Sequence, residues 1–354
     1  MTQRTWAALL AVPLFVALGI YAAVSPLPFV SYAPGPTVNV LGDDGSKPII
    51  NVQGHRTYRD DGELRMTTVS VTQRDARLDL FTLMQTWAFQ RDNALYPFSV
   101  QYGEEGSPQQ DTEEGQVEMI RSQDSAVAAA LRQLGYPVHP ALEILAVTPD
   151  MPADGKLRER DVVREFDGTR VTASTQLAKL IQAVPAGEKV PITLERKGRT
   201  VTEMVAPVEK DGNKLIGVTL GIGYTFPFKV SVNISDRIGG PSAGLMFALS
   251  IYDTLTPGPL TSGGNVAGTG TIDAAGRVGE IGGIQQKIVG ARQDGAQLFL
   301  VPPANCADAL TSNHGSMRLA KATTLKSAIA DVEAWATDHD APLPQCTAAD
   351  GRGS

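Results

Sequence analysis

A serine held in a turn of glycine and proline, directly before an apolar run, constrains this chain more than any other feature. The turn reads Gly-Gly-Pro-Ser-Ala-Gly over residues 239–244, and the run occupies residues 245–255. Within the run, Leu245, Leu249 and Tyr252 recur at the spacing of one helix face. The sequence therefore predicts a helix that begins at the turn.

Ser242 would lie at the N-terminus of that helix, where the first backbone N–H groups have no partner within the helix. Pro241 suits the first turn because its missing N–H costs nothing there. The free N–H groups can stabilise an oxyanion, so we expect Gly240, Pro241 and Ala243 to form the backbone turn of an oxyanion site. The plainer interpretation is a serine that serves only as a helix cap or turn residue.

A second segment, residues 282–287, begins with Gly-Gly and carries a lysine on an apolar face. Ile284, Lys287, Ile288 and Ala291 follow helix spacing, so Lys287 lies within the apolar stripe. Such a lysine either extends its ammonium group to water or is desolvated. Desolvation lowers the pKa and gives a neutral general base, which a nearby serine could use without any histidine.

These motifs together resemble the proteolytic domain of the Lon protease family, which uses a Ser–Lys dyad. The resemblance covers roughly residues 215–335. It implies that Ser242 is the nucleophile, that Lys287, 45 positions further on, is the general base, and that Thr269 supports the dyad. The matching segments are Gly-Pro-Ser-Ala-Gly at 240–244, Val-Ala-Gly-Thr-Gly at 266–270, Gly-Arg-Val at 276–278, Ile-Gly-Gly at 281–283, residues 291–295, and Leu-Val-Pro at 300–302 followed by Asn305.

Two positions depart from the family pattern. Gly239 stands where many Lon enzymes have an acidic residue, and Thr271 stands where many have glutamate. The motif G-x-x-x-x-G-K-[ST] does not occur, because Leu245 replaces the lysine that should follow Gly244. We therefore expect an ATP-independent serine endopeptidase whose substrates are unfolded or extended polypeptides.

Residues 6–24 contain no charge, and at 1.5 Å per residue a helix of this length spans about 28 Å. We expect residues 1–30 to hold a cytoplasmic N-terminus and a transmembrane anchor. Arg4 precedes the apolar segment and no Lys or Arg follows before Lys47, which places the rest of the chain outside the cytoplasm. The alternative is a cleaved signal peptide, although no clean cleavage site closes the run.

The expected architecture is an α+β multidomain protein: an N-terminal transmembrane helix, a PDZ-like β-rich domain and a C-terminal Lon-type proteolytic domain. Within its N-terminal α/β region, we predict an exposed loop over residues 101–116 and an amphipathic helix over residues 117–134. The expected units are 1–30, the anchor; 31–136, the N-terminal α/β region; 137–210, the PDZ-like domain; 211–340, the proteolytic domain; and 341–354, a tail.

The PDZ resemblance rests on Val-Thr-Pro-Asp-Met-Pro-Ala at 147–153, Leu-Arg-Glu-Arg-Asp-Val-Val at 157–163 and Phe-Asp-Gly at 166–168. One departure is Arg160, where the family usually has glycine. The resemblance implies that an extended peptide adds to the strand at 142–147, beside the helix at 174–183, with contacts to Ile144, Leu145 and Ala146. The occupant could be a substrate, a partner or the chain's own segment, and a structural role is equally open.

Composition excludes some classes of function. The net charge of −7 argues against nucleic acid as a partner. No C-x-x-C or H-E-x-x-H motif occurs, so neither a metal nor another cofactor is implied. Cys306 and Cys346 either form a disulfide or remain as two free thiols.

Two other interpretations compete with a Lon-like endopeptidase. C-terminal processing proteases also join a PDZ domain to a Ser–Lys dyad, although the segment at 282–295 favours Lon. A non-catalytic PDZ scaffold or chaperone with an inactive Lon-like domain would keep its function in a Ser242→Ala variant. The Lon resemblance also implies a homo-oligomer, with a hexameric ring as the form common in that family.

Overall fold

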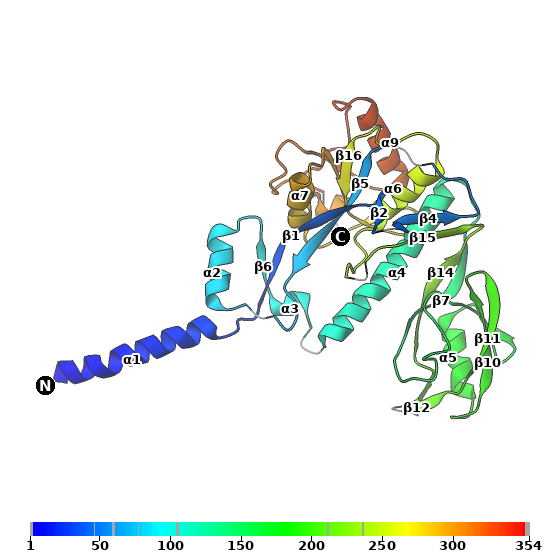
Figure 1. Ribbon diagram of the computed structural model, residues 1–354, viewed down its shortest axis with the longest axis horizontal. Coiled ribbons are helices and arrows are strands. Elements are labelled where there is room, and N and C mark those ends of the chain that lie inside the picture. The colour runs from blue at the N-terminus through cyan, green and yellow to red at the C-terminus, as the bar shows by residue number, and fades with distance from the viewer. Residues whose placement is uncertain are drawn as a thin grey trace.

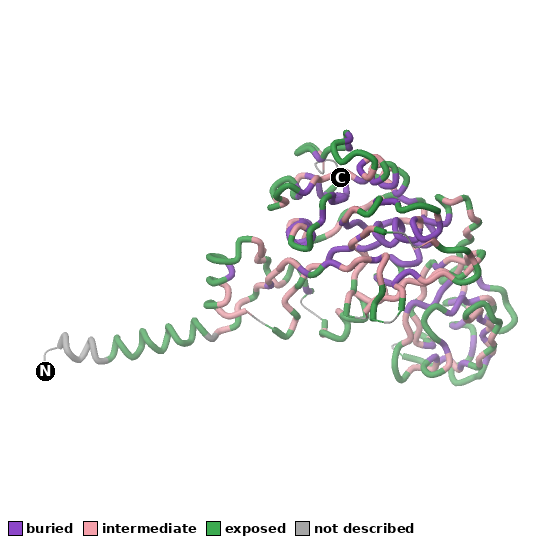
Figure 2. The backbone as a smooth tube through the Cα atoms, turned by 45° about the horizontal axis from the view of Figure 1, so that its top comes forward, coloured by how far each residue is buried: buried purple, intermediate pink, exposed green. Residues whose placement is uncertain are grey.

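The computed structural model describes residues 3–45, 47–58, 61–76, 78–103, 106–210, 212–235 and 237–350. Helix α1 (Gln3–Val24) extends away from the body of the molecule, and its side chains at residues 10–23 are exposed (Figures 1 and 2). No helix in the described part of the chain has both the length and the apolar character that a bilayer crossing requires. The prediction of a transmembrane anchor is therefore wrong.

One large mixed sheet joins strands from the two ends of the chain. Strand β16 is parallel to β5 and β19, and β19 is parallel to β20, whereas β1 is antiparallel to β5 and β6. Strands from residues 29–97 and strands from residues 265–321 thus form one continuous sheet. In spatial order the strands are β20 (Arg318–Lys321), β19 (Leu298–Val301), β16 (Asn265–Gly268), β5 (Glu63–Val71), β1 (Phe29–Asn39) and β6 (Ala94–Pro97).

Helices cover both faces of this sheet. Because side chains alternate along a strand, Val266 and Leu300 pack in one core, whereas Ala267 and Val301 pack in another. The first core also receives α4 (Pro108–Gln133), α6 (Gly244–Leu255) and α9 (Leu325–Thr337), and the second receives α7 (Ile284–Gln293). Helices α6 and α7 thus lie on opposite faces and can meet only beyond a strand end.

Helix α4 is longer than the sequence predicts. Ser107 caps it by accepting a hydrogen bond from the Gln110 N–H at 3.3 Å, and Pro108 occupies its first turn. The predicted loop at 101–116 is therefore wrong over residues 108–116, which are helical. The sequence did not reveal this part of the helix, because the first turns of α4 are largely exposed and show no apolar periodicity. The predicted helix over residues 117–134 is confirmed as the buried part of α4.

The PDZ-like region forms a second unit with its own core, at the lower right of Figure 1. Its sheet runs β11-β10-β8-β7-β14, and Phe166, Leu177 and Ile192 are fully buried in it. Figure 2 shows buried residues gathered in the larger unit and, separately, in this PDZ-like unit. The elements of this unit are β7 (His139–Val147), β8 (Val162–Phe166), β9 (Thr169–Arg170), α5 (Ser174–Ala183), β10 (Val190–Arg196), β11 (Arg199–Val205) and β14 (Val218–Thr225).

Short elements connect and cover these two units. Cys306 and Cys346 form a disulfide that holds the C-terminal segment against α8, which settles the pairing that the sequence left open. The short elements are β2 (Asp43–Asp44), β3 (Lys47–Pro48), β4 (Ile50–Gln53), α2 (Leu80–Phe89), α3 (Phe98–Gln101), β12 (Val208–Lys210), β13 (Asn213–Leu215), β15 (Lys229–Val232), β17 (Thr271–Ile272), β18 (Val278–Gly279), η1 (Pro303–Asn305) and α8 (Cys306–Ala309).

Candidate active site

Ser242 lies at the start of α6, just beyond the carboxyl end of β16. Its carbonyl oxygen accepts hydrogen bonds from the Gly270 N–H at 2.8 Å and from Thr269 Oγ1 at 3.0 Å. Gly240 turns the chain toward the serine with a φ of 88°, a conformation that glycine adopts without steric cost. The strand end thus fixes the backbone of Ser242, while the side chain points into the space between α6 and α7.

Lys287 reaches the same point from the other face of the sheet. It lies in the first turn of α7, and only 4% of its surface is exposed. Its Nζ donates to Ser242 Oγ at 2.6 Å and to Thr269 Oγ1 at 3.2 Å. The structure therefore brings together the three side chains that the sequence singled out as a dyad and its support.

Burial changes the acidity of the lysine. Loss of solvent lowers the pKa of Lys287 to about 7, because an ammonium ion is poorly stabilised away from water. An amine with such a pKa is neutral in a large fraction of molecules near neutral pH. It can then accept a proton from a hydroxyl group at hydrogen-bond distance.

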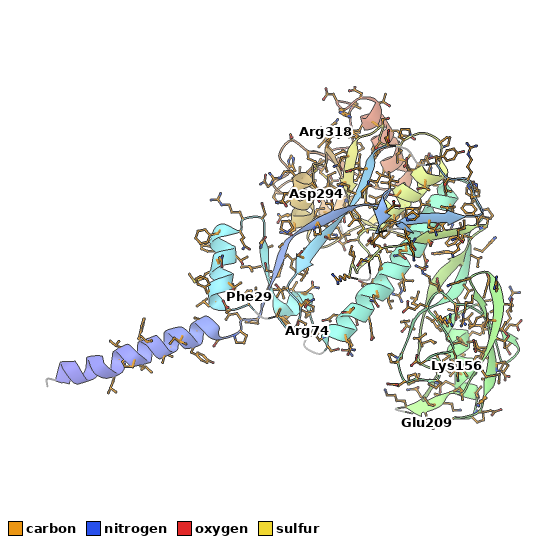
Figure 3. The ribbon with its side chains drawn as sticks, viewed as in Figure 1. Phe29, Arg74, Lys156, Glu209, Asp294 and Arg318 are labelled. Atoms are coloured by element: carbon orange, nitrogen blue, oxygen red, sulfur yellow. A yellow bond between two sulfur atoms is a disulfide. The ribbon has the colours of Figure 1, made fainter. Side chains whose placement is uncertain are left out.

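The packing of α7 against β1 sets the position of this lysine. Asp294, at the end of α7, is labelled in Figure 3. It accepts hydrogen bonds from the Thr37 N–H at 3.0 Å and from Thr37 Oγ1 at 2.6 Å. Gly290 passes so close to the strand that a Cβ atom there would lie 2.5 Å from the Gly35 oxygen. Nothing in the local sequence around Lys287 indicates these contacts, because their partners lie some 250 residues away.

Two further hydrogen bonds fix the backbone just before α7. The Asn305 side chain accepts from the Ile281 N–H at 3.0 Å and donates to the Ile281 oxygen at 2.9 Å. Gly283 follows in the left-handed conformation, with a φ of 67°, and starts the helix. Asn305 belongs to the Lon-like pattern in the sequence, and the structure shows what its side chain contacts.

The three residues of the predicted oxyanion turn differ in their surroundings. The Gly240 N–H donates to the Gly115 oxygen at 2.9 Å, and proline has no N–H, so neither Gly240 nor Pro241 offers a donor to an oxyanion. Ala243 caps α6, and its N–H lies beside the nucleophile. The Pro241 oxygen accepts a hydrogen bond from Ser122 Oγ at 2.9 Å, a contact that the sequence did not indicate.

The strand that carries Ile144, Leu145 and Ala146 has neighbours on both sides. Strand β14 pairs antiparallel with β7 over residues 139–147, and β8 pairs with β7 on the other edge. A peptide could add to this strand only if β14 left it. The chain's own segment thus occupies the place that the PDZ resemblance assigns to an extended ligand.

Metal ligation has no visible basis in the described residues. No group of three or more His, Cys, Asp or Glu side chains gathers there in a way that could hold an ion.

The arrangement around Ser242 is suited to nucleophilic attack by a hydroxyl group with an amine as its base.

Comparison with known proteins identifies both units. The model of the Lon protease (S16) C-terminal proteolytic domain matches residues 237–331, and the model of the PDZ domain matches residues 116–206. The PDZ domain of the SdrC-like protein from Listeria monocytogenes is 24% identical and covers 23% of this chain and 86% of its own, with a TM-score of 0.22. That likeness is too weak to carry an argument.

Several Lon proteases are similar over the proteolytic part. Lon protease 2 of Herpetosiphon aurantiacus is 45% identical over 69 residues, which are 20% of this chain and 8% of that protein. The Lon protease of Mesomycoplasma hyopneumoniae is 41% identical over 66 residues, 19% of this chain and 7% of that protein. The Lon protease of Chlamydia pneumoniae is 29% identical over 159 residues, 41% of this chain and 19% of that protein.

These matches leave most of each relative uncovered, since the shared part is between 7% and 19% of their length. They support the catalytic domain alone, and they say nothing of the ATP-driven machinery of a whole Lon protease. The chain therefore contains a PDZ domain and a Lon-type proteolytic domain, and the second of these supports a serine peptidase.

Proposed function

We propose that the chain is an ATP-independent endopeptidase that cleaves unfolded or extended polypeptides with Ser242 as nucleophile and Lys287 as general base. The observation that carries the proposal is the 2.6 Å contact between Lys287 Nζ and Ser242 Oγ, made by a lysine that burial makes less basic. A structural lysine would instead extend to solvent or pair with a carboxylate.

The reaction begins with neutral Lys287. Its amine takes the proton of Ser242 Oγ as that oxygen attacks the carbonyl carbon of a peptide bond. The N–H groups at the start of α6, with Ala243 among them, stabilise the oxyanion that forms. Protonated Lys287 then gives its proton to the leaving amine, which departs and leaves an ester on Ser242.

Deacylation uses the same base. Lys287 takes a proton from a water molecule, which attacks the ester carbon, and returns the proton to Ser242 Oγ as the new carboxyl end leaves. In the proposal Thr269 keeps the amine directed at the serine throughout, because its Oγ1 lies 3.2 Å from Nζ. No nucleotide enters these steps, which agrees with the absence of a G-x-x-x-x-G-K-[ST] motif from the sequence.

We further propose that the protein works in an oxidising compartment outside the cytoplasm and as a homo-oligomer, with a hexameric ring as the form to test. The Cys306–Cys346 disulfide supports the compartment, because such bonds persist mainly where thiols are not kept reduced. In this proposal the PDZ domain gates or recognises substrate.

The test compares the full chain with its Ser242→Ala and Lys287→Ala variants on an unfolded fluorescently labelled protein, without ATP. We expect cleavage by the parent and none by either variant. Reaction of the parent serine with a fluorophosphonate, and its loss in Ser242→Ala, identifies the nucleophile independently of any substrate. Equal cleavage by all three proteins would assign the activity to another site and overturn the proposal.

A non-catalytic scaffold or chaperone is the second candidate. Strand β14 fills the edge of β7 where a peptide would add. If β14 never leaves that edge, the PDZ domain delivers no substrate to Ser242, and its role is structural. A scaffold would protect an unfolded client from aggregation equally well in the parent and in Ser242→Ala. The same two proteins therefore distinguish the candidates.

A further inference from the structure

Arg160 adopts a backbone conformation that its side chain disfavours. Its φ is 64°, in the left-handed region where glycine is at ease and a long side chain is strained. Strain of this kind persists where surrounding contacts hold the residue in place, and it points to a role for that residue. The backbone itself is fixed, because the Arg160 N–H donates to the Ile144 oxygen of β7 at 2.8 Å.

The Arg160 side chain leaves the PDZ domain and binds α4. Its Nη1 donates to Asp124 Oδ1 at 2.6 Å, and its Nη2 donates to Gln123 Oε1 at 2.6 Å. Glu143 Oε1 of β7 lies 3.9 Å from Nη1 on the PDZ side. Both partners on α4 are almost fully buried, so α4 and the PDZ sheet are fixed to each other at this point.

The residue of α4 that precedes this pair holds the nucleophile turn. Ser122 Oγ donates to the Pro241 oxygen at 2.9 Å, one residue before Ser242. About two helical turns earlier the two segments meet again, since the Gly240 N–H donates to the Gly115 oxygen at 2.9 Å. A Cβ atom at Gly244 would lie 2.9 Å from Ser122 Oγ, so the turn fits against α4 with no room to spare.

We infer that Arg160 is a positioning residue that couples the PDZ domain to the proteolytic site: it fixes α4 in the place from which Ser122 and Gly115 hold the turn of Ser242. The inference rests on the proposed function and names how that site is regulated. Movement of the PDZ domain against α4 would act on the nucleophile through two hydrogen bonds, without any contact between the PDZ domain and the serine.

The Arg160 side chain is accessible from the surface of the molecule. Its side chain is 45% exposed, and it lines a cleft of about 620 Å³ between the two units. The cleft is also lined by Gln116 and Gln123 of α4, and by Ile234 and Ile238 of the segment that leads into the nucleophile turn. A polypeptide lying in this cleft would touch the arginine, the helix and that segment together.

The test uses the full chain and four proteins besides the parent. Arg160→Gly removes the side chain and also relieves the backbone strain at this position, which offsets part of the cost of leaving Asp124 buried without its partner. Ser122→Ala removes the contact to Pro241, and the double variant combines the two. The matched control is Arg164→Ala, which deletes an arginine whose ion pair with Glu195, at 2.5 Å, stays within the PDZ sheet.

We expect Arg160→Gly and Ser122→Ala each to lower kcat per fluorophosphonate-titrated serine on a short peptide about tenfold, with KM changed less than about twofold. A purely structural role would instead lower the titrated fraction and leave kcat per titrated site unchanged. Because both residues act through one turn, the double variant should be no slower than the slower single variant. Additive losses, or a kcat for Arg160→Gly equal to that of Arg164→Ala, would overturn the inference.

A measurement that needs no catalysis separates this inference from the proposed function. Arg160→Gly should raise the hydrogen-exchange rate of the Gly240 amide about tenfold, because the amide's bond to the Gly115 oxygen loosens, and Arg164→Ala should leave it unchanged. Faster exchange in a protein whose parent cleaves nothing would keep the coupling and reject the peptidase. Unchanged exchange would reject the coupling whatever the activity.

Discussion

Lys287 Nζ lies 2.6 Å from Ser242 Oγ, although the two residues are 45 positions apart. Lys287 lies in α7 and Ser242 in the turn that precedes α6, and these two helices cover opposite faces of one sheet. They meet beyond the carboxyl end of β16, where Thr269 contacts both the lysine amine and the serine carbonyl. The relationship depends on the sheet, on the start of each helix and on the burial of the amine. Each of these can be perturbed separately.

Replacing Lys287 with methionine should remove activity without lowering stability. Methionine has a similar length and no polar atom, so the cost of burying an amine disappears. We expect the peptidase rate to fall about 10³-fold or more, since a dyad works as a unit. The thermal midpoint should stay level or rise in calorimetry. Cleavage at the parental rate by Lys287→Met would show that the amine is not the base.

The pH profile of kcat should report the lysine. Only neutral Lys287 can accept the serine proton, and its pKa is lowered to about 7 by burial. The rate should therefore rise about tenfold per pH unit below that value and level off above it. The check is kcat on a short peptide across this range, with acylation rate-limiting. A profile that is flat through pH 7 would contradict the assignment.

Gly290→Ala should displace α7. The new methyl group would meet the Gly35 oxygen at 2.5 Å, so the helix or β1 must shift, at a cost of about 1–3 kcal/mol in unfolding free energy. The shift moves Lys287 and should lower kcat as well. Gly282→Ala is the control, since a Cβ there meets nothing within 4 Å. Equal stability of the two variants in denaturant titrations would disprove the close contact.

Glu143 should make stability depend on pH. Burial, and then the neighbouring Asp124, raise its pKa from 4.5 to about 8, against a smaller opposite effect of Arg160. The folded protein thus holds a proton that the unfolded chain has lost between these values, and unfolding free energy falls as the pH rises through that window. Glu143→Gln should flatten that fall, as measured by urea titrations. Parallel curves for parent and variant would contradict it.

Reduction of the Cys306–Cys346 disulfide should destabilise the proteolytic domain. The bond closes a loop with a sequence separation of 40, which corresponds to roughly 4 kcal/mol of lost loop entropy in the unfolded chain. Dithiothreitol should lower the thermal midpoint of the parent, and Cys306→Ala/Cys346→Ala should match the reduced parent. An unchanged midpoint after complete reduction, verified by thiol titration, would contradict the prediction.

The pairing of Ser242 with Lys287 could be predicted because each partner has a local signature. Ser242 follows a glycine-proline turn, and Lys287 interrupts an apolar helix face, so neither required knowledge of the rest of the chain. The contacts that position them could not be predicted, because Ser122 lies 119 residues from Pro241 and Thr37 lies 257 residues from Asp294. No periodicity within one segment encodes a partner at that distance.

Long-range pairing also explains the other differences. The place of strand β5 beside β16 depends on residues some 200 positions away along the chain. The predicted anchor failed for a different reason, because it rested on a local signal alone. An uncharged stretch of sequence did not give a membrane-spanning helix among the described residues. Arg160 stood out as a departure from glycine, and the partners of its side chain on α4 became visible only in the structure.

The sheet of the PDZ domain includes strand β14, which lies outside the residues that the PDZ family model matches. The matched region ends at residue 206, whereas the strand that covers the edge of β7 runs from residue 218 to residue 225 and leads on toward the nucleophile. A fragment that stops before this strand would expose a row of unpaired N–H and C=O groups along β7, and such edges recruit strands from neighbouring molecules. A PDZ fragment that ends at residue 206 would thus bind peptides along the exposed edge of β7. The affinity measured with such a fragment would be a product of the truncation.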